Sequence, residues 1–321
     1  MPRDFVNVQI LYAGMIAVVA GLVAAGFSGR FPEIPLAPQN AAEMIPAWDP
    51  QTGLQYVGML WPMLFITVSC GAISGFHCLV SSGTTARQLS CESHACKVGY
   101  RSMLLESMLA VSIILTLLVG MDWENYRLIT YGEKNPILAV SLATGTLVHT
   151  AFGLPLWPGT VLGILLLEGF VVTTLDVAVR LNRYLIEEIW KFLFKNPHPI
   201  LSSAWFNTSL CVGLMYLISR SNSLPMLWQV FGSANQMMGA IALLVASVWL
   251  RDHGRRWAFT LIPAILMFAT TLASTSISLW KNTQLGNWPL VATCGVLILL
   301  GIGLAAIGTR IFLAPRRTAP I

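Results

Sequence analysis

PLVATCGVLILLGIGLAAIGTRIFL, residues 289–313, is a run of 25 residues that contains one charged side chain, Arg310. A helix needs about 20 consecutive apolar residues to cross the hydrocarbon core of a bilayer, and this run exceeds that length. Over the whole chain of 321 residues, 55% are hydrophobic and 10% are charged, whereas about 25% are charged in an ordinary soluble domain. The composition therefore excludes a soluble globular protein and predicts an all-α, polytopic helical membrane protein.

Seven further stretches approach the same length, and a shorter one at about 136–154 is marginal. The seven lie at about 8–27, 57–80, 102–121, 158–180, 203–219, 228–250 and 258–280. If the marginal stretch does not cross and the N-terminus is cytoplasmic, most of the 19 Lys and Arg residues fall on the cytoplasmic side, as the positive-inside rule requires. We therefore predict about eight transmembrane helices with both termini cytoplasmic. Residues 136–154 are then re-entrant or lie along the outer surface, which their Asn-Pro opening and Gly-Leu-Pro ending suit.

Two connections between the spans are long and polar. Residues 28–56 are expected to form an extracytoplasmic loop and residues 181–202 a cytoplasmic loop. No soluble domain is visible, so residues 1–321 are expected to form a single transmembrane domain. The net charge of +5 is then a topology signal from loops that face anionic lipid, and no nucleic-acid partner is predicted.

The end of the second span, CGAISGFHCLVSSGTTARQL at residues 70–89, is rich in glycine and hydroxyl residues where Leu and Val would be expected. Unwound backbone at membrane depth persists only when it lines a cavity or is buried in protein, so we predict a discontinuous helix at a substrate site. The candidate substrate-binding residues are Ser74, Gly75, His77, Ser81, Ser82, Gly83 and Thr84. The alternative is a small-residue packing face, because Gly71 and Gly75 have Gly-xxx-Gly spacing.

A second amide-bearing segment, LWQVFGSANQMMG, carries Asn235 and Gln236 near the start of a later span. Amides can bind a carboxylate or an ion, but they also hold helices together. We add both residues to the candidate substrate site.

Acidic residues within apolar segments mark function by default. Glu168 has no cation nearby in sequence and is predicted near mid-membrane, where a carboxyl is readily protonated. We predict that it relays protons, the alternative being a neutral Glu that hydrogen-bonds another helix. Glu106 and His77 are the further proton-coupling candidates. Asp176 and Arg180, four residues apart, are predicted to form a structural ion pair.

Several other chemistries find little support. Cys91, His94 and Cys96 have a C-x2-H-x-C spacing that is not usual for zinc. No phosphate-binding Walker sequence is present, which argues against ATP-driven transport by this chain. We predict no metal, no cofactor and no enzymatic activity.

The same regions resemble the carbon starvation protein A (CstA) family. The matching blocks are LFITVSCGAISGFHCLVSSGTTARQLSCE (64–92), GYRSMLLES (99–107), LLEGFVVTTLDVAVRLNRYLIEEI (166–189) and LWQVFGSANQMMGAIALL (227–244). The resemblance implies a carrier in the bacterial cytoplasmic membrane that takes up peptides or pyruvate with protons when carbon is short. Members usually have further spans before the Pro2-Arg3-Asp4 motif at which this chain starts.

The leading hypothesis is therefore a proton-coupled secondary transporter for peptides or pyruvate-like small carboxylates, or the C-terminal part of one, for which a separate N-terminal half would be a further partner. Its partners are the substrate, protons and the lipid bilayer. The alternative from another class is a non-transporting membrane subunit or nutrient sensor. A weaker rival is a lipid-embedded hydrolase that uses Ser74 and His77.

Overall fold

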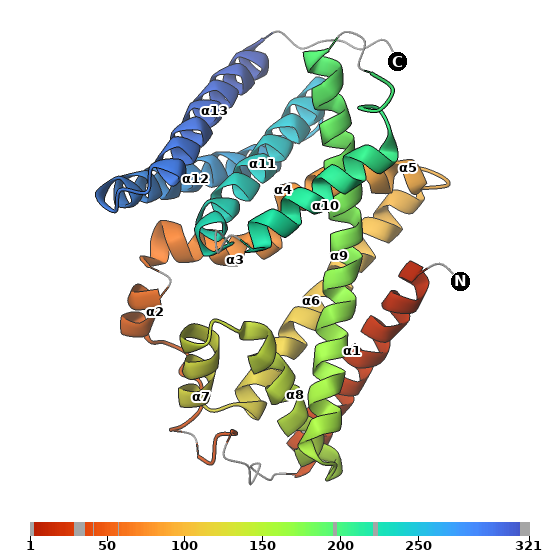
Figure 1. Ribbon diagram of the computed structural model, residues 1–321, viewed down its shortest axis with the longest axis vertical. Coiled ribbons are helices and arrows are strands. Elements are labelled where there is room, and N and C mark those ends of the chain that lie inside the picture. The colour runs from red at the N-terminus through yellow and green to blue at the C-terminus, as the bar shows by residue number, and fades with distance from the viewer. Residues whose placement is uncertain are drawn as a thin grey trace. The chain divides into compact units, whose positions relative to one another are not determined.

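The computed structural model describes residues 3–28, 36–40, 42–56, 58–194, 198–220 and 224–314. Within these ranges the regular structure is helical, and no strand occurs. The helices shown in Figure 1, with π-helices written η, are α1 (Arg3–Ser28), α2 (Pro50–Tyr56), η1 (Leu60–Leu64), α3 (Phe65–Ala72), α4 (Gly75–Val80), η2 (Ser81–Thr85), α5 (Ala86–Gln88), α6 (His94–Gly120), α7 (Trp123–Arg127), η3 (Leu128–Gly132), α8 (Pro136–Phe152), α9 (Leu156–Leu193), α10 (Ala204–Arg220), α11 (Leu224–Asp252), α12 (Ala258–Gln284) and α13 (Trp288–Leu313).

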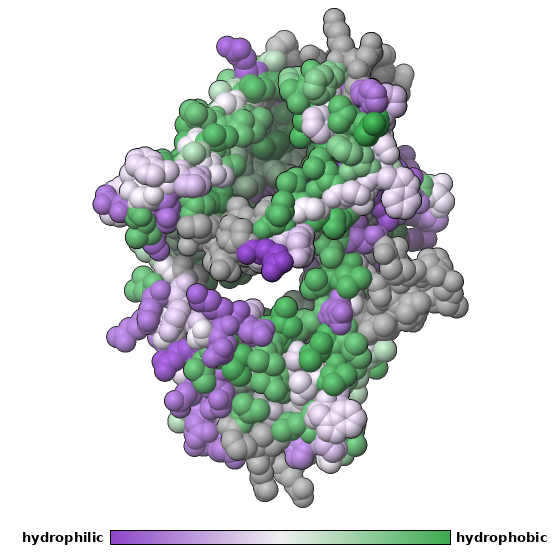
Figure 2. All heavy atoms as spheres, viewed as in Figure 1, coloured by the Kyte–Doolittle hydropathy of each residue, from purple (hydrophilic) through white to green (hydrophobic). Residues whose placement is uncertain are grey.

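Six helical stretches of the described chain are long and apolar enough to cross a membrane. They are Leu60–Gln88, His94–Gly120, Leu156–Leu193, Val230–Asp252, Ala258–Gln284 and Trp288–Leu313. Large apolar side chains on these helices face outward, as in Leu299 on α13, which is 73% exposed, and Figure 2 shows hydrophobic side chains over α13 and α9. A surface of this kind suits lipid rather than water. The predicted all-α, polytopic membrane protein is confirmed.

Three shorter apolar helices, Tyr12–Ala24, Pro136–Phe152 and Ala204–Leu217, coincide with the first and fifth predicted spans and with the marginal segment. Whether each of them crosses the membrane stays a prediction, as do the orientation of the termini and the sides on which the loops lie. The loop expected at 181–202 begins as helix, because α9 continues to Leu193.

The contacts of the chain divide it into two compact units. Unit 1 comprises Met1–Asp49 and Leu89–Ala178, and unit 2 comprises Pro50–Gln88 and Val179–Ile321. The single domain expected for residues 1–321 remains a prediction, and each unit is described by itself below.

Helix α8 forms the interior of unit 1. Every residue from Ala143 to Val148 is buried, and Leu147 packs with Val18, Leu109 and Leu166 from α1, α6 and α9. Asn135 caps the start of α8 by accepting the N–H of Leu138 at 3.1 Å. Burial of this kind suits the re-entrant alternative better than an exposed surface segment, because a re-entrant helix needs protein around it.

Glycines allow α8 to approach its neighbours. A Cβ atom added to Gly120 of α6 would lie 2.8 Å from the Cα atom of Ala143, and one added to Gly163 of α9 would lie 2.9 Å from that of Ser141. Small residues at such crossings let helix backbones pack closely where lipid provides no hydrophobic driving force.

In unit 2, α11 and α12 pack side by side and antiparallel, and α13 packs against both. Two hydroxyl pairs fix their register. The Ser233 and Ser274 oxygens lie 3.4 Å apart, and the Ser247 and Thr260 oxygens lie 2.8 Å apart. Each step along α11 therefore corresponds to an equal step backwards along α12.

We expect Gly120→Ala to destabilise unit 1, because its methyl group would overlap the Ala143 backbone. Overpacking of this kind costs about 1–3 kcal/mol, and thermal unfolding of the detergent-solubilised chain would measure it as a lowered Tm. Gly99→Ala on the same helix is the matched control, since nothing lies within 4 Å of its added Cβ. Equal Tm values for the two variants would contradict the close α6–α8 approach.

Candidate functional site

The second span is broken near its middle. Ile73 (φ −131°, ψ 98°) and Ser74 (φ −113°, ψ 126°) are extended, so α3 ends at Ala72 and α4 begins at Gly75. Ser74 then caps the new helix, since its hydroxyl oxygen accepts the N–H of His77 at 3.4 Å. The discontinuous helix predicted from residues 70–89 is confirmed.

Asn235 of α11 holds this break in place. Its Oδ1 atom accepts the N–H of Phe76 at 2.8 Å, and its Nδ2 group donates to Ser74 Oγ at 3.2 Å and to Cys70 Sγ at 2.9 Å. Asn235 is 5% exposed and Ser74 is 8% exposed. The amide therefore bonds to backbone and side-chain groups on both sides of the break. Of the two roles considered for Asn235, this is the one that holds helices together.

Gly75 lies where α4 crosses α11. A Cβ atom at this position would collide with Met238 and with the Asn235 carbonyl, and would lie 2.9 Å from the Gly239 nitrogen. Nothing lies within 4 Å of the Cβ that Gly71 would carry. Gly75 thus serves helix packing, and the substrate-binding role predicted for this region stays a prediction.

The hydroxyl residues beyond the break lie along η2. Ser82 donates to the carbonyl of Cys78 at 2.9 Å, and Thr84 donates to that of Val80 at 2.8 Å, so both bond within their own helix. His77, Ser81 and Ser82 are exposed, and Thr84 is buried. A Cβ atom added to Gly83 would lie 3.6 Å from the Leu181 side chain. Of the predicted binding residues, the structure brings Ser74, Gly75 and Asn235 together, and the η2 residues lie outside that contact.

Gln236, the next residue along α11, is in a different situation. It is 0% exposed, and neither atom of its amide finds a hydrogen-bond partner among the described residues. The α11–α12 register set by Ser233 with Ser274 and by Ser247 with Thr260 places Thr271 at the same level along α12.

Thr271 shares this condition. It is also 0% exposed, and its hydroxyl has no partner within the described ranges. Buried polar groups are nearly always hydrogen-bonded, and each exception calls for an explanation. We refer to Gln236 and Thr271 as the polar pair.

The buried hydroxyl residues of α12 were not predicted from the sequence. Five of them are buried, namely Thr270, Thr271, Ser274, Thr275 and Ser278. Trp61 Nε1 donates to Thr270 Oγ1 at 3.3 Å, which ties the start of the broken span to α12. The signal was present as the run FATTLASTSIS at 268–278, which is unusually polar for a span.

The predicted proton-coupling carboxylates belong to unit 1. Glu168 on α9 and Glu106 on α6 are exposed on that unit. No side chain in the described part of the chain forms a hydrogen bond or ion pair with either of them. Asp176 and Arg180 each make polar or charged interactions, and their pairing with each other stays a prediction.

A polytopic helical membrane protein with a broken span, held by buried side-chain bonds from a neighbouring helix, has the architecture typical of secondary transporters. The family model "Carbon starvation protein CstA" matches residues 1–131 and 125–274. The chain belongs to the carbon starvation protein CstA family, and the predicted resemblance is confirmed. No solved structure matches the chain.

Curated relatives carry transporter names. The "Peptide transporter CstA" of Helicobacter pylori strain J99 is 31% identical over 330 residues, which is 85% of this chain and 46% of that protein. That of Campylobacter jejuni is 28% identical over 328 residues, 84% of this chain and 44% of that protein. The "Pyruvate/proton symporter BtsT" of Escherichia coli K12 is 27% identical over 349 residues, which is 85% of this chain and 47% of that protein. The chain spans about half the length of the curated relatives it matches.

The two adjacent amides should respond differently to substitution. Asn235→Leu leaves the Phe76 N–H and the Ser74 hydroxyl without their partner, and an unsatisfied buried group costs about 1–3 kcal/mol. Gln236→Met removes an amide that has no partner among the described residues, so stability should be unchanged or higher. Thermal unfolding of both variants in detergent would measure this, and a larger loss for Gln236→Met would contradict the assigned roles.

Proposed function

We propose that this chain forms the C-terminal part of a proton-coupled secondary transporter for peptides or pyruvate-like small carboxylates, which acts in the response to carbon starvation. Family membership supports the proposal, together with relatives named as a peptide transporter and a pyruvate/proton symporter. The observation that carries it is the broken span fixed by Asn235 beside the polar pair. The relatives' names do not favour a non-transporting subunit or sensor, and none of those names is that of an enzyme.

The proposed setting follows from the same family. We place the chain in the bacterial cytoplasmic membrane with both termini cytoplasmic, and we propose a separate N-terminal half as a partner. Transporters of this broad type bind substrate near the midplane between two structural repeats. A second half would supply the wall of the site that faces this chain.

In this proposal the polar pair contacts the substrate. The Gln236 amide offers two donors and an acceptor, and the Thr271 hydroxyl offers one donor and an acceptor. This combination can bind either a carboxylate or a peptide bond. The helix beyond the break carries further proposed substrate contacts, namely His77, Ser81, Ser82, Gly83 and Thr84. The break itself is held in place by Asn235, Ser74 and Gly75.

Proton coupling is assigned to Glu168, with His77 and Glu106 as further candidates. Glu168 lies in the apolar part of α9 and is exposed on unit 1, where a substrate or a second half can reach it. An ionisable residue within a membrane span is a functional-site candidate by default, and a carboxyl is a group that can exchange a proton during transport.

We expect Glu168→Gln to leave folding intact and to abolish accumulation driven by a proton gradient. Uptake of labelled pyruvate and of a dipeptide would be measured in proteoliposomes that hold the chain alone or with an N-terminal half. Glu188→Gln is the matched control, because Glu188 is an exposed acid farther along the same helix. Accumulation at the wild-type level in Glu168→Gln would remove this residue from the mechanism.

Gln236→Met should lose most uptake while its Tm remains at or above that of the wild type, because it removes only the unpartnered amide. Thr271→Val tests the second member of the polar pair in the same uptake assay. Gln284→Met, at the exposed end of α12, is the control for a Gln replaced outside the pair. Full uptake by both Gln236→Met and Thr271→Val would show that the pair has a purely structural role.

A further inference from the structure

An apolar groove in unit 2 is not used by the proposed function. It has a volume of about 420 Å³, and α11, α12 and α13 line it, a size within the range of ligand sites. Its walls include Leu244, Ile265, Phe268, Ala305 and Phe312. The lining hydroxyl, Thr309 Oγ1, is already bonded to the Ala305 carbonyl at 2.7 Å. The groove therefore offers little to a polar ligand and suits a hydrocarbon chain.

The groove opens to the surroundings of the helices. Ile265 is 59% exposed and Leu313 is 78% exposed, and both belong to its lining. Helices α12 and α13 have the length and composition of membrane spans. The surroundings at this depth are consequently lipid acyl chains.

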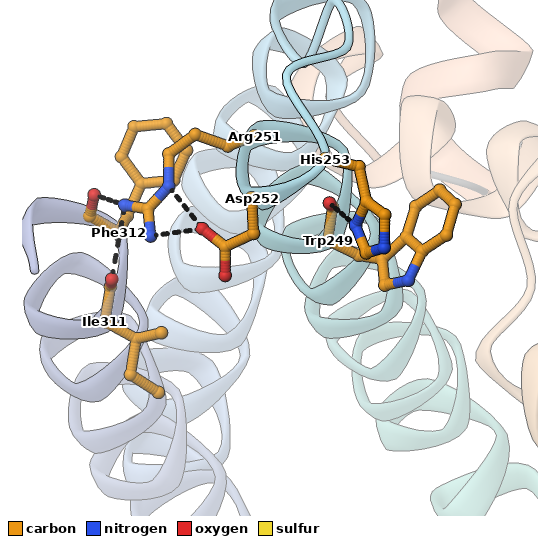
Figure 3. Close-up of polar contacts among 6 residues, drawn as sticks. All are labelled: Trp249, Arg251, Asp252, His253, Ile311 and Phe312. Atoms are coloured by element: carbon orange, nitrogen blue, oxygen red, sulfur yellow. Dashed lines mark hydrogen bonds and ion pairs between the residues drawn. The ribbon is translucent and has the colours of Figure 1, made fainter. Parts of the chain in front are cut away.

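One end of the groove meets a fixed turn. Trp257, in the turn between α11 and α12, contacts Phe312 with ring centroids 5.0 Å apart. Figure 3 shows Arg251 beside the end of α13, where it donates to the carbonyls of Ile311 and Phe312 and to Asp252. His253 stacks on Trp249 with centroids 4.2 Å apart. The contacts of Arg251 and Trp257 hold the turn against the end of α13.

Among the described residues, the exposed charges at this end of the groove are positive. Arg251 is 7% exposed and occupied by Asp252 and the α13 carbonyls, so the Asp252 charge is largely compensated. Arg255 and Arg256, in the turn next to Trp257, and Arg310, two residues before Phe312, are exposed. An apolar groove that ends among exposed arginines is complementary to an amphiphile with an anionic head.

We propose that this groove binds an anionic phospholipid, with one acyl chain along α12 and α13 and the phosphate group at Arg255, Arg256 and Arg310. Basic residues near an anionic lipid surface attract it, and the arginine guanidinium forms paired hydrogen bonds with phosphate oxygens. A second copy of the chain is less suited to this groove, because its matching surface would bring the same arginines together.

The test is native mass spectrometry of the delipidated, detergent-solubilised chain, titrated with phosphatidylglycerol or with phosphatidylcholine of the same acyl chains. The wild type should bind phosphatidylglycerol more tightly. The double variant Arg255→Gln/Arg256→Gln should weaken that binding roughly 30-fold, which corresponds to about 1 kcal/mol for each arginine. Arg255→Lys/Arg256→Lys should retain most of the binding, because the charge is kept.

Two further variants separate the groove from the general charge of the surface. Ala305→Phe fills the groove and should weaken binding of both lipids, whereas Lys281→Gln removes an exposed charge at the other end of α12 and should have no effect. Tm values check that each variant is folded. Equal binding of the two lipids, an Ala305→Phe variant that binds like the wild type, or a mass that shows a second copy instead of lipid would each overturn the proposal.

Discussion

The backbone of the second span depends on one buried amide. The helical backbone ends at Ala72 and begins again at Gly75, and unsatisfied N–H and C=O groups at membrane depth cost several kcal/mol each. Asn235 accepts the Phe76 N–H and donates to Ser74 and Cys70, so α11 provides hydrogen-bond partners on both sides of the break. The contact with α11 at this distance and in this register therefore stabilises the extended residues.

The short distance between α4 and α11 depends in turn on glycine. Gly75 and Gly239 lie at the α4–α11 crossing, and a side chain at Gly75 would displace the helix that carries Asn235. Glycine has the same role in unit 1, where Gly120 of α6 and Gly163 of α9 let the backbone of α8 pack closely against both helices. In both units, therefore, close backbone contact at glycine positions helps to hold these features in place.

The sequence predicts these features unevenly. The break at 70–89 and the ends of α8 could be predicted, since Gly, Ser, Asn-Pro and Gly-Leu-Pro act locally. The extent of α9 could not, because Glu187, Glu188 and Lys191 read as loop residues although they continue the helix. Nor could the roles of Asn235 and Gln236 be separated. Adjacent residues point about 100° apart on a helix, and only the packing of α11 decides which of the two meets the broken span.

The polar pair is destabilising as the structure stands, because its buried polar atoms have no hydrogen-bond partner among the described residues. Leaving a buried amide without partners costs about 1–3 kcal/mol, and an apolar side chain of the same volume would avoid that cost. Asn235, one position earlier, shows that this helix can place an amide so that its donors and acceptor are used. Gln236 and Thr271 instead keep unpartnered polar atoms beside the broken span. Buried polar groups without partners break the usual rules of stable packing, and such exceptions are expected at functional sites. Here the exception lies on the helices that hold the discontinuous span in place.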